Sequence, residues 1–199
     1  MAEPGTWTSA AADGRASTRD RLLDAAVELF YRDGVHIGVE ALCRAAGVSK
    51  RSMYQLFDSK DELVAESLRR GAAAFDAFML PAADDDRPPR ERILHVFRQM
   101  EVSSRNPDFQ GCPYVATAVE LKAPQHPASR AAREYKDSLT AFFRDELRQA
   151  GAKNPELLAK QLTIVFDGAG ARAVVQGAPL DGIGVQTAQL LLDGAGIAA

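Results

Sequence analysis

The 199-residue sequence has few cysteines, few histidines and no long apolar run, and each shortage excludes a class of protein. No stretch approaches the roughly 20 consecutive apolar residues that a membrane-spanning helix needs. The two cysteines, Cys43 and Cys112, lie far apart and do not indicate a disulfide framework. The N-terminus lacks the charged and then apolar pattern of a secretion signal, so we expect a cytoplasmic protein.

Catalytic and metal-binding motifs are also missing from the sequence. The three histidines, His36, His95 and His126, are scattered and lack the spacing of a metal site. There is no serine nucleophile elbow, no phosphate-binding Walker loop and no dinucleotide fingerprint. The pair Gly168 and Gly170 follows a helical pattern rather than a strand, which does not suit phosphate binding. We therefore expect no enzymatic activity, no metal and no cofactor.

Positive charge is concentrated in one short segment of an acidic chain. The formal net charge is −3, which argues against a protein that coats nucleic acid without sequence preference. From Cys43 to Leu56, however, the sequence contains Arg44, Lys50 and Arg51 and no acidic residue. Such a local patch predicts a limited number of phosphate contacts, with an affinity that falls as salt rises.

The same segment has the pattern of two helices joined by a tight turn. Gly47 interrupts an apolar helical pattern and can adopt the positive φ that the turn requires. Ser49 is suited to cap the second helix. Met53 and Phe57 recur at helical spacing together with Val48, so we expect these three side chains to face a core. The intervening polar side chains then point away from the core.

These outward side chains suit the reading of DNA in a major groove. Lys50 or Arg51 can reach a guanine edge or a phosphate, and Gln55 can pair with an adenine edge. Ser59 and Glu62 have the spacing of a capping box, and the start of that helix is an anion site next to Lys60. The predicted DNA contacts are Arg44, Ser49, Lys50, Arg51, Ser52, Tyr54, Gln55 and Lys60.

The run from Ala45 to Ser49, followed by Tyr54, Phe57, Ser59-Lys60 and Leu63, resembles the DNA-binding region of TetR-family (TetR/AcrR-like) transcriptional regulators. The resemblance covers about residues 18–64. This sequence has Gly38 where the family usually has a capping threonine or serine, and Cys43 where it usually has alanine. Gln55 stands where histidine or an aromatic residue is common, which bears on the operator that is read.

The remaining sequence predicts an all-α protein. We expect a disordered N-terminal arm over residues 1–16, a three-helix helix-turn-helix domain over 17–62, and a helical ligand-binding and dimerisation domain over 63–199. Capping residues, prolines and apolar periodicity predict further helices. They span Ser17 to Gly34, Val39 to Ala46, Asp61 to Leu80, Pro89 or Arg90 to about Arg105, Pro113 to Leu121, Ala128 to Ala150, and two apolar segments after Asn154.

Aromatic and apolar residues in the second domain indicate a ligand pocket, although they are equally explained as core. The candidate pocket residues are Phe75, Phe97, Met100, Cys112, Tyr114, Tyr135, Phe142 and Phe166. The two final helices combine interior glycines with a wide apolar surface, and the resemblance implies that they form a four-helix dimer interface. Its candidate residues are Phe166, Gly170, Val174, Leu190 and Leu191, with an intramolecular core as the alternative.

The resulting hypothesis is a homodimeric, sequence-specific regulator. We expect it to be a repressor that leaves a palindromic double-stranded operator when a small apolar or aromatic effector binds. An alternative is a thiol-based sensor of oxidants or electrophiles, in which Cys112, at the start of a helix, carries the signal. A second alternative is a small-molecule enzyme or binding protein that merely retains a helix-turn-helix.

Overall fold

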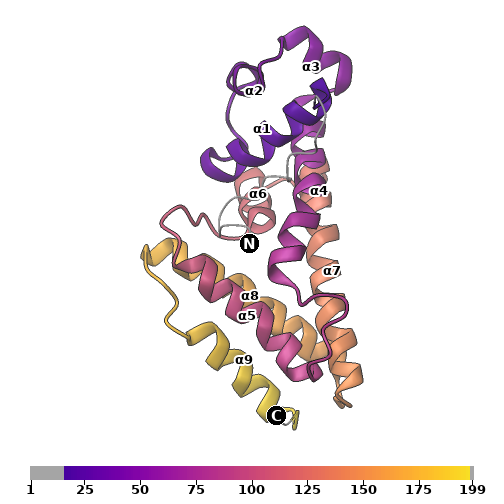
Figure 1. Cartoon of the computed structure of the whole chain (residues 1–199), viewed down its shortest axis with the longest axis vertical. Helices are drawn as coiled ribbons and strands as arrows, with labels where there is room; N and C mark the ends of the chain where they lie inside the picture. Colours follow the sequence, from indigo (N-terminus) through magenta and orange to yellow (C-terminus); the bar gives the residue numbers. More distant parts are fainter. Residues whose placement is uncertain (1–15, 198–199) are drawn as a thin grey trace. The chain divides into compact units, whose positions relative to one another are not determined.

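The computed structural model describes residues 16–197, so the predicted arm lies outside the described residues except for its last position. This range contains nine helices and no strand, which confirms the all-α prediction (Figure 1). The helices are α1 Thr18–Asp33, α2 Val39–Ala46, α3 Lys50–Leu56, α4 Lys60–Met79, α5 Pro89–Ser104, α6 Pro113–Leu121, α7 Pro127–Gln149, α8 Pro155–Gln176 and α9 Ile183–Gly194. None of them is both long enough and apolar enough to cross a membrane.

The ends of the first helices follow the predicted capping residues. Ser17 Oγ accepts a hydrogen bond from the backbone N–H of Asp20 at 3.1 Å and starts α1. Gly47 ends α2 with φ +64°, the left-handed conformation that the turn requires. Ser49 Oγ then accepts from the backbone N–H of Ser52 at 3.0 Å and starts α3. Gly38, at the start of α2, supplies no side-chain cap.

The chain forms two compact units. Residues 16–75 and 113–134 form what we call the helix-turn-helix unit, and residues 76–112 and 135–197 form what we call the bundle unit. Helices α4 and α7 each contribute residues to both units. The domain boundary expected between residues 62 and 63 is a functional division and stays a prediction. The units themselves group the chain differently, because residues 113–134, which include α6, belong to the same compact unit as α1 to α3.

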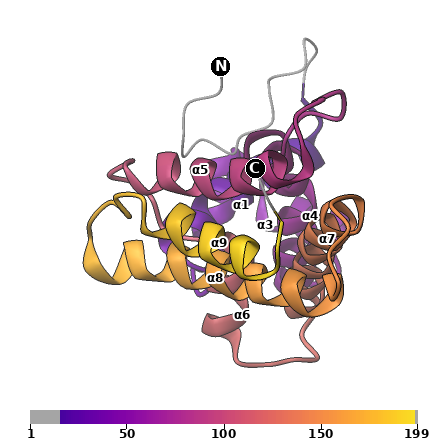
Figure 2. The same cartoon turned by 90° about the horizontal axis from the view of Figure 1, so that it is seen from below.

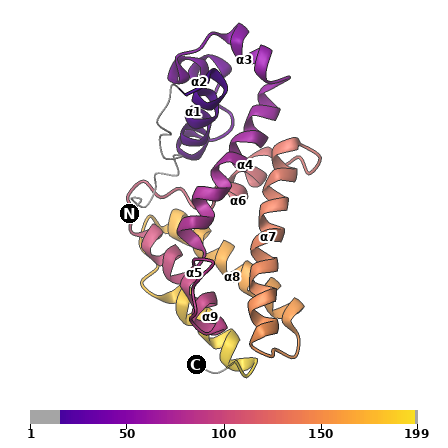
Figure 3. The ribbon, with the colours of Figure 1, turned by 45° about the vertical axis from the view of Figure 1, so that its right-hand side comes forward.

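The core of the helix-turn-helix unit is formed where α1, α2 and α3 pack together (Figure 3). Met53 and Phe57 are buried, as their spacing predicts, whereas Val48 is only half-buried. On α2, Leu42, Cys43 and Ala46 are buried, while Ala41 and Ala45 are exposed. Only one stripe of an eight-residue helix can face α1 and α3, and the larger Leu42 and Cys43 side chains occupy it together with Ala46.

The bundle unit is held together by α5, α8 and α9, which lie side by side (Figure 2). The Phe97 ring stacks on Phe143 at a centroid distance of 5.8 Å and meets the edge of Phe166 at 6.3 Å. The buried carboxylate of Glu101 on α5 fixes the start of α9: it accepts from the backbone N–H groups of Gly182 and Gly184, at 2.9 and 3.1 Å. A buried anion at a helix N-terminus is stabilised by the helix dipole.

Candidate nucleic-acid interface

Helix α3 presents its polar side chains to solvent. Lys50, Arg51 and Gln55 are exposed, and Tyr54 is 49% exposed. Beneath them, Met53 is fully buried and anchors the helix. The predicted exposure of Arg51 and Tyr54 is therefore confirmed, whereas their contacts with DNA stay predictions.

The other predicted contact residues differ in how far their polar groups are already engaged. Arg44 is exposed, and Lys50 Nζ lies 3.9 Å from Glu40 Oε1 in a solvent-exposed ion pair. Such a pair contributes little and is readily exchanged for a phosphate. The hydroxyls of Ser49 and Ser52 lie 2.8 Å apart, so both take part in capping α3. These two serines have less freedom to reach DNA than the long side chains beside them.

Lys60 is half-buried in the first turn of α4. Its Nζ donates to the carbonyl oxygen of Val35 at 2.5 Å, and burial lowers the pKa of its ammonium group. Ser59 Oγ accepts from the backbone N–H of Glu62 at 3.1 Å, as expected for a capping box. The reciprocal bond differs by one residue, because Glu62 Oε2 accepts from the N–H of Asp58 at 2.7 Å rather than from Ser59.

Helix α6 contributes a residue that the sequence reasoning missed. The carboxylate of Glu120 accepts from the backbone N–H groups of Val35 and His36, both at 2.9 Å. Its Oε1 also lies 3.0 Å from Nδ1 of His36. Glu120 is separated from the α1–α2 turn by more than 80 residues, so local pattern gives no signal for this contact.

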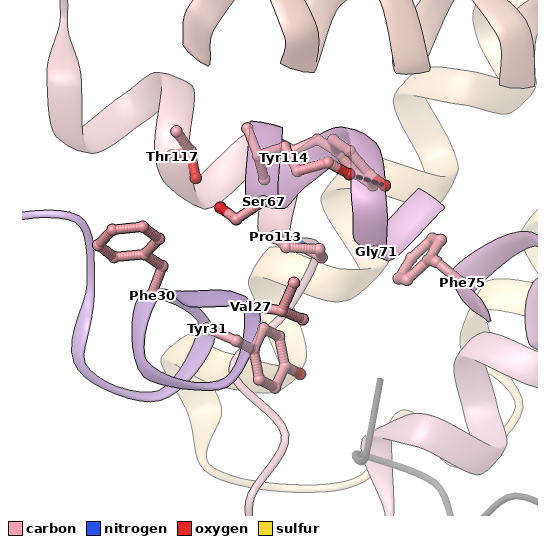
Figure 4. Close-up of a pocket in the computed structure, with 10 residues that line it drawn as sticks. Val27, Phe30, Tyr31, Ser67, Gly71, Phe75, Pro113, Tyr114 and Thr117 are labelled. Atoms are coloured by element: carbon pink, nitrogen blue, oxygen red, sulfur yellow. Dashed lines mark hydrogen bonds between the residues drawn. The ribbon is translucent and has the colours of Figure 1, made fainter. Parts of the chain in front are cut away.

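A small apolar cavity lies within the helix-turn-helix unit between α1, α4 and α6 (Figure 4). Its volume is about 30 Å³. It is lined by Val27, Phe30, Tyr31, Ser67, Leu68, Gly71, Phe75, Pro113, Tyr114 and Thr117. The Tyr114 ring meets Phe75 edge to face at 5.7 Å, and its hydroxyl donates to the carbonyl oxygen of Leu68 at 3.3 Å. Two of the predicted pocket residues therefore share a cavity.

The other six predicted pocket residues belong to the bundle unit. Phe97, Met100 and Phe166 are completely buried and pack as core, and Cys112 is also buried. Tyr135 Oη donates to Asp76 Oδ1 at 2.7 Å; partial burial nonetheless raises the pKa of that carboxyl group. Phe142 is half-buried with its ring 5.6 Å from Phe143. No metal-ligand group of three or more His, Cys, Asp or Glu side chains occurs among residues 16–197.

The predicted dimer residues fall into two groups. Leu190 is 71% exposed and Val174 is also exposed, while Leu191 is half-buried. Phe166 and Gly170 instead face the interior of their own chain. A Cβ atom at Gly170 would stand 3.4 Å from Met100 Cε and 3.8 Å from the backbone nitrogen of Cys112, so this position lies against the interior of its own chain. For these two residues the intramolecular alternative holds.

Two short helices joined at a left-handed glycine, with exposed basic and amide side chains on the second, define a helix-turn-helix DNA-binding protein. Residues 22–67 match the sequence model of the family described as bacterial regulatory proteins, tetR family. The crystal structure of sav143 from Streptomyces avermitilis MA-4680, assigned to the TetR transcriptional regulators, is 59% identical and has a TM-score of 0.88. That match covers 92% of this chain and 100% of the other.

Two further proteins similar to this chain are also described as transcriptional regulators. The HTH-type transcriptional regulator Rv1255c of Mycobacterium tuberculosis is 35% identical over 89 residues, which is 44% of this chain and 43% of that protein, so the chain spans less than half of this curated relative. SCO4454 of Streptomyces coelicolor, a TetR-family regulator, is 23% identical, has a TM-score of 0.80 over 89% of this chain and 95% of its own, and shares the fold. The chain belongs to the TetR family of transcriptional regulators. The resemblance seen in the sequence is confirmed, as is the expectation that the protein is no enzyme.

Proposed function

We propose that the protein is a homodimeric repressor that binds a palindromic operator and leaves it when a small apolar or aromatic effector binds. The observation that carries this proposal is the surface of α3, where Arg51, Tyr54 and Gln55 are exposed above the buried Met53. A recognition helix needs this combination, since its base must be rigid while its polar side chains stay available to DNA. Lys50, Arg51 or Gln55 would read base edges, and Tyr54 would hold a phosphate.

An exposed apolar stripe on α8 and α9 supports the dimer. On α8, Ile164 and Val175 are 70% and 78% exposed, and the exposed Gly168 and Ala171 lie between them on the same helical face. A Cβ atom at Gly168 would meet nothing within 4 Å in its own chain. A glycine costs about 1 kcal/mol in a helix relative to alanine, and close approach of a second helix would account for its presence.

On α9, Leu190 is also exposed, and it lines the same surface hollow as the exposed Leu157 of α8. Contiguous apolar patches on a protein surface mark interaction sites. Two such helices from each chain would bury the stripe in a four-helix interface with two-fold symmetry. A dimer with two-fold symmetry requires a palindromic operator, whose half-sites lie about one turn of the DNA helix apart or a multiple of that distance.

The apolar cavity beside α1 supports an effector of apolar or aromatic character. Its lining includes Phe75 and Tyr114 from the predicted pocket. A volume of about 30 Å³ accommodates only a few atoms, whereas pockets for drug-sized ligands measure about 300–1,000 Å³. An effector that enters here would therefore have to separate α6 from α1 or α4. Binding and conformational change would be coupled because the ligand has affinity only for the opened state.

The thiol-sensor alternative has less support. Cys112 is 5% exposed, and burial keeps a thiol from reacting with oxidants until the surrounding structure opens.

A footprinting and mobility-shift experiment tests the proposal. The probe is the DNA upstream of the protein's own coding region, with a scrambled sequence of the same composition as control. We expect protection of an inverted repeat by a dimer. Protection of a single half-site by a monomer, or equal binding to both probes, would contradict the operator proposal. Release by mild oxidant from the wild type but not from Cys112→Ser would favour the thiol sensor.

A further inference from the structure

The turn between α1 and α2 is built around a carboxylate from α6. Glu120 accepts hydrogen bonds from the backbone N–H groups of Val35 and His36 and lies against the His36 ring. The backbone at Gly34 has φ +84°, and a Cβ atom there would stand 2.8 Å from Glu120 Oε2. Glycine is therefore favoured at this position for its backbone conformation, and a larger residue would have to displace the carboxylate.

The same turn is held from a second side by α4. Lys60 Nζ donates to the carbonyl oxygen of Val35, whose N–H is bound by Glu120. Both polar backbone groups of Val35 are thus satisfied by charged side chains, while its own side chain is buried. Hydrogen bonds to charged groups are stronger than those between neutral groups, so this turn has a well-defined position.

The position of the turn matters because α2 begins directly after it. Helix α2 starts at Val39, three residues beyond His36, and ends at Gly47, from which α3 follows. A shift of the turn would therefore displace α2 and, through its packing contacts, α3. The carboxylate is partly buried, which by itself would raise its pKa, but the hydrogen bonds from Val35 and His36 lower the pKa of Glu120 on balance. The ionised form is therefore the one that holds the turn.

The face of α6 that carries Glu120 also lines the cavity. Tyr114, Thr117 and Glu120 recur at intervals of three residues, so they lie along one side of the helix. The first two line the cavity, and the third binds the α1–α2 turn. A movement of α6 that opens the cavity would pull the carboxylate from the turn.

We propose that Glu120 is a positioning residue for DNA binding. It fixes the positions of α2 and α3 through the α1–α2 turn, and it makes the recognition helix α3 respond to movement of α6. This inference rests on the proposed operator binding. It deepens that proposal by identifying the side chain through which the recognition helix is placed. Glu120 itself would contact no DNA.

The experiment compares Glu120→Ala and Glu120→Gln with the wild-type chain. Glu134→Gln is the matched control, because it removes an exposed carboxylate of the same unit that pairs with Arg69 instead. Circular dichroism confirms that each variant is folded at the assay temperature. Amide hydrogen exchange of α2 and α3 is measured without DNA. The Kd for the footprinted DNA is then measured over a series of salt concentrations.

For Glu120→Ala we expect faster exchange at Val35, His36 and throughout α2, together with a Kd about tenfold higher. Glu120→Gln retains one acceptor oxygen and should give an intermediate loss, which also decides the outcome if the alanine variant does not fold. The slope of log K against log salt should stay unchanged, because no phosphate contact is lost. Glu134→Gln should match the wild type in both measurements.

Wild-type exchange in α2 and an unchanged Kd in Glu120→Ala would overturn the inference. A reduced salt slope would also overturn it, because Glu120 would then act through the phosphate contacts themselves. If the wild-type chain binds no upstream DNA, the operator proposal fails, whereas the exchange measurement still shows whether Glu120 positions α2.

Discussion

Gly71 of α4 faces Val27 of α1 across the apolar cavity: a Cβ atom at Gly71 would stand 3.8 Å from Val27 Cγ1 and 4.0 Å from Cγ2. Both distances are ordinary van der Waals contacts, so the position accepts a methyl group without displacing its neighbours. The cavity therefore owes part of its volume to the absence of one side chain.

Gly71→Ala should raise the free energy of unfolding by about 1 kcal/mol, because alanine is favoured over glycine inside a helix and its methyl group fills apolar space. Urea unfolding of the two chains measures the difference. If the cavity is where the effector enters, the variant should also need more effector to release DNA. A decrease in stability would show that the close packing of α4 on α1 does not tolerate the methyl group.

Asp76→Asn should stabilise the bundle unit at neutral pH. Burial raises the pKa of Asp76. The protonated side chain therefore stabilises the folded state below the ordinary aspartate pKa, and this stabilisation is lost as pH rises through the raised pKa. At neutral pH the charge is therefore a cost, and an amide oxygen can still accept from the Tyr135 hydroxyl. We expect a Tm a few degrees higher at neutral pH and a gap that closes as Asp76 protonates. A gap independent of pH would contradict this reasoning.

Leu190→Glu should convert the dimer into monomers, because a carboxylate in the apolar stripe would be buried without a partner. Sedimentation velocity at several concentrations gives the dissociation constant. Ala77→Glu is the control: it places the same charge on an exposed site of α4 in the same unit, outside α8 and α9. Equal behaviour of the two variants would remove the support for this interface.

Tyr54→Ala and Lys60→Ala should each weaken binding to operator and to random DNA by similar factors, as expected for phosphate contacts. Lys60→Ala should also lower the salt slope by about one, whereas Tyr54→Ala removes an uncharged hydroxyl and should leave the slope unchanged. They should differ in stability, because Lys60→Ala leaves the Val35 carbonyl without its charged donor, while Tyr54 is half exposed. A loss confined to operator DNA would assign these side chains to base reading.

Arg51→Ala and Gln55→Ala should change which sequence is preferred, with a loss of about 1–3 kcal/mol of discrimination at the base pair each one reads. Selection from a library of randomised sites measures the preference directly. Unchanged preference in both variants would move the base contacts elsewhere on α3.

Much of the helix-turn-helix unit could be predicted from the local sequence pattern. Ser17, Gly34, Gly47 and Ser49 act at helix ends through bonds within three or four residues, so their spacing is visible in the sequence. The exposure of Arg51 and Tyr54 follows from the burial of Met53 by helical periodicity. The inward face of α2 was harder to predict, because in a helix of alanines and a cysteine the periodicity alone fits more than one face.

By itself, the sequence determined the helices, the tight turn and the polar surface of α3, because these depend on interactions between near neighbours. Only the tertiary structure decided which apolar residues are core and which are surface, placing Phe166 and Gly170 inside and Ile164 and Val175 outside. It also brought Glu120 to the α1–α2 turn. Contacts between residues more than 80 positions apart depend on how helices pack, and packing leaves no periodic trace in either segment.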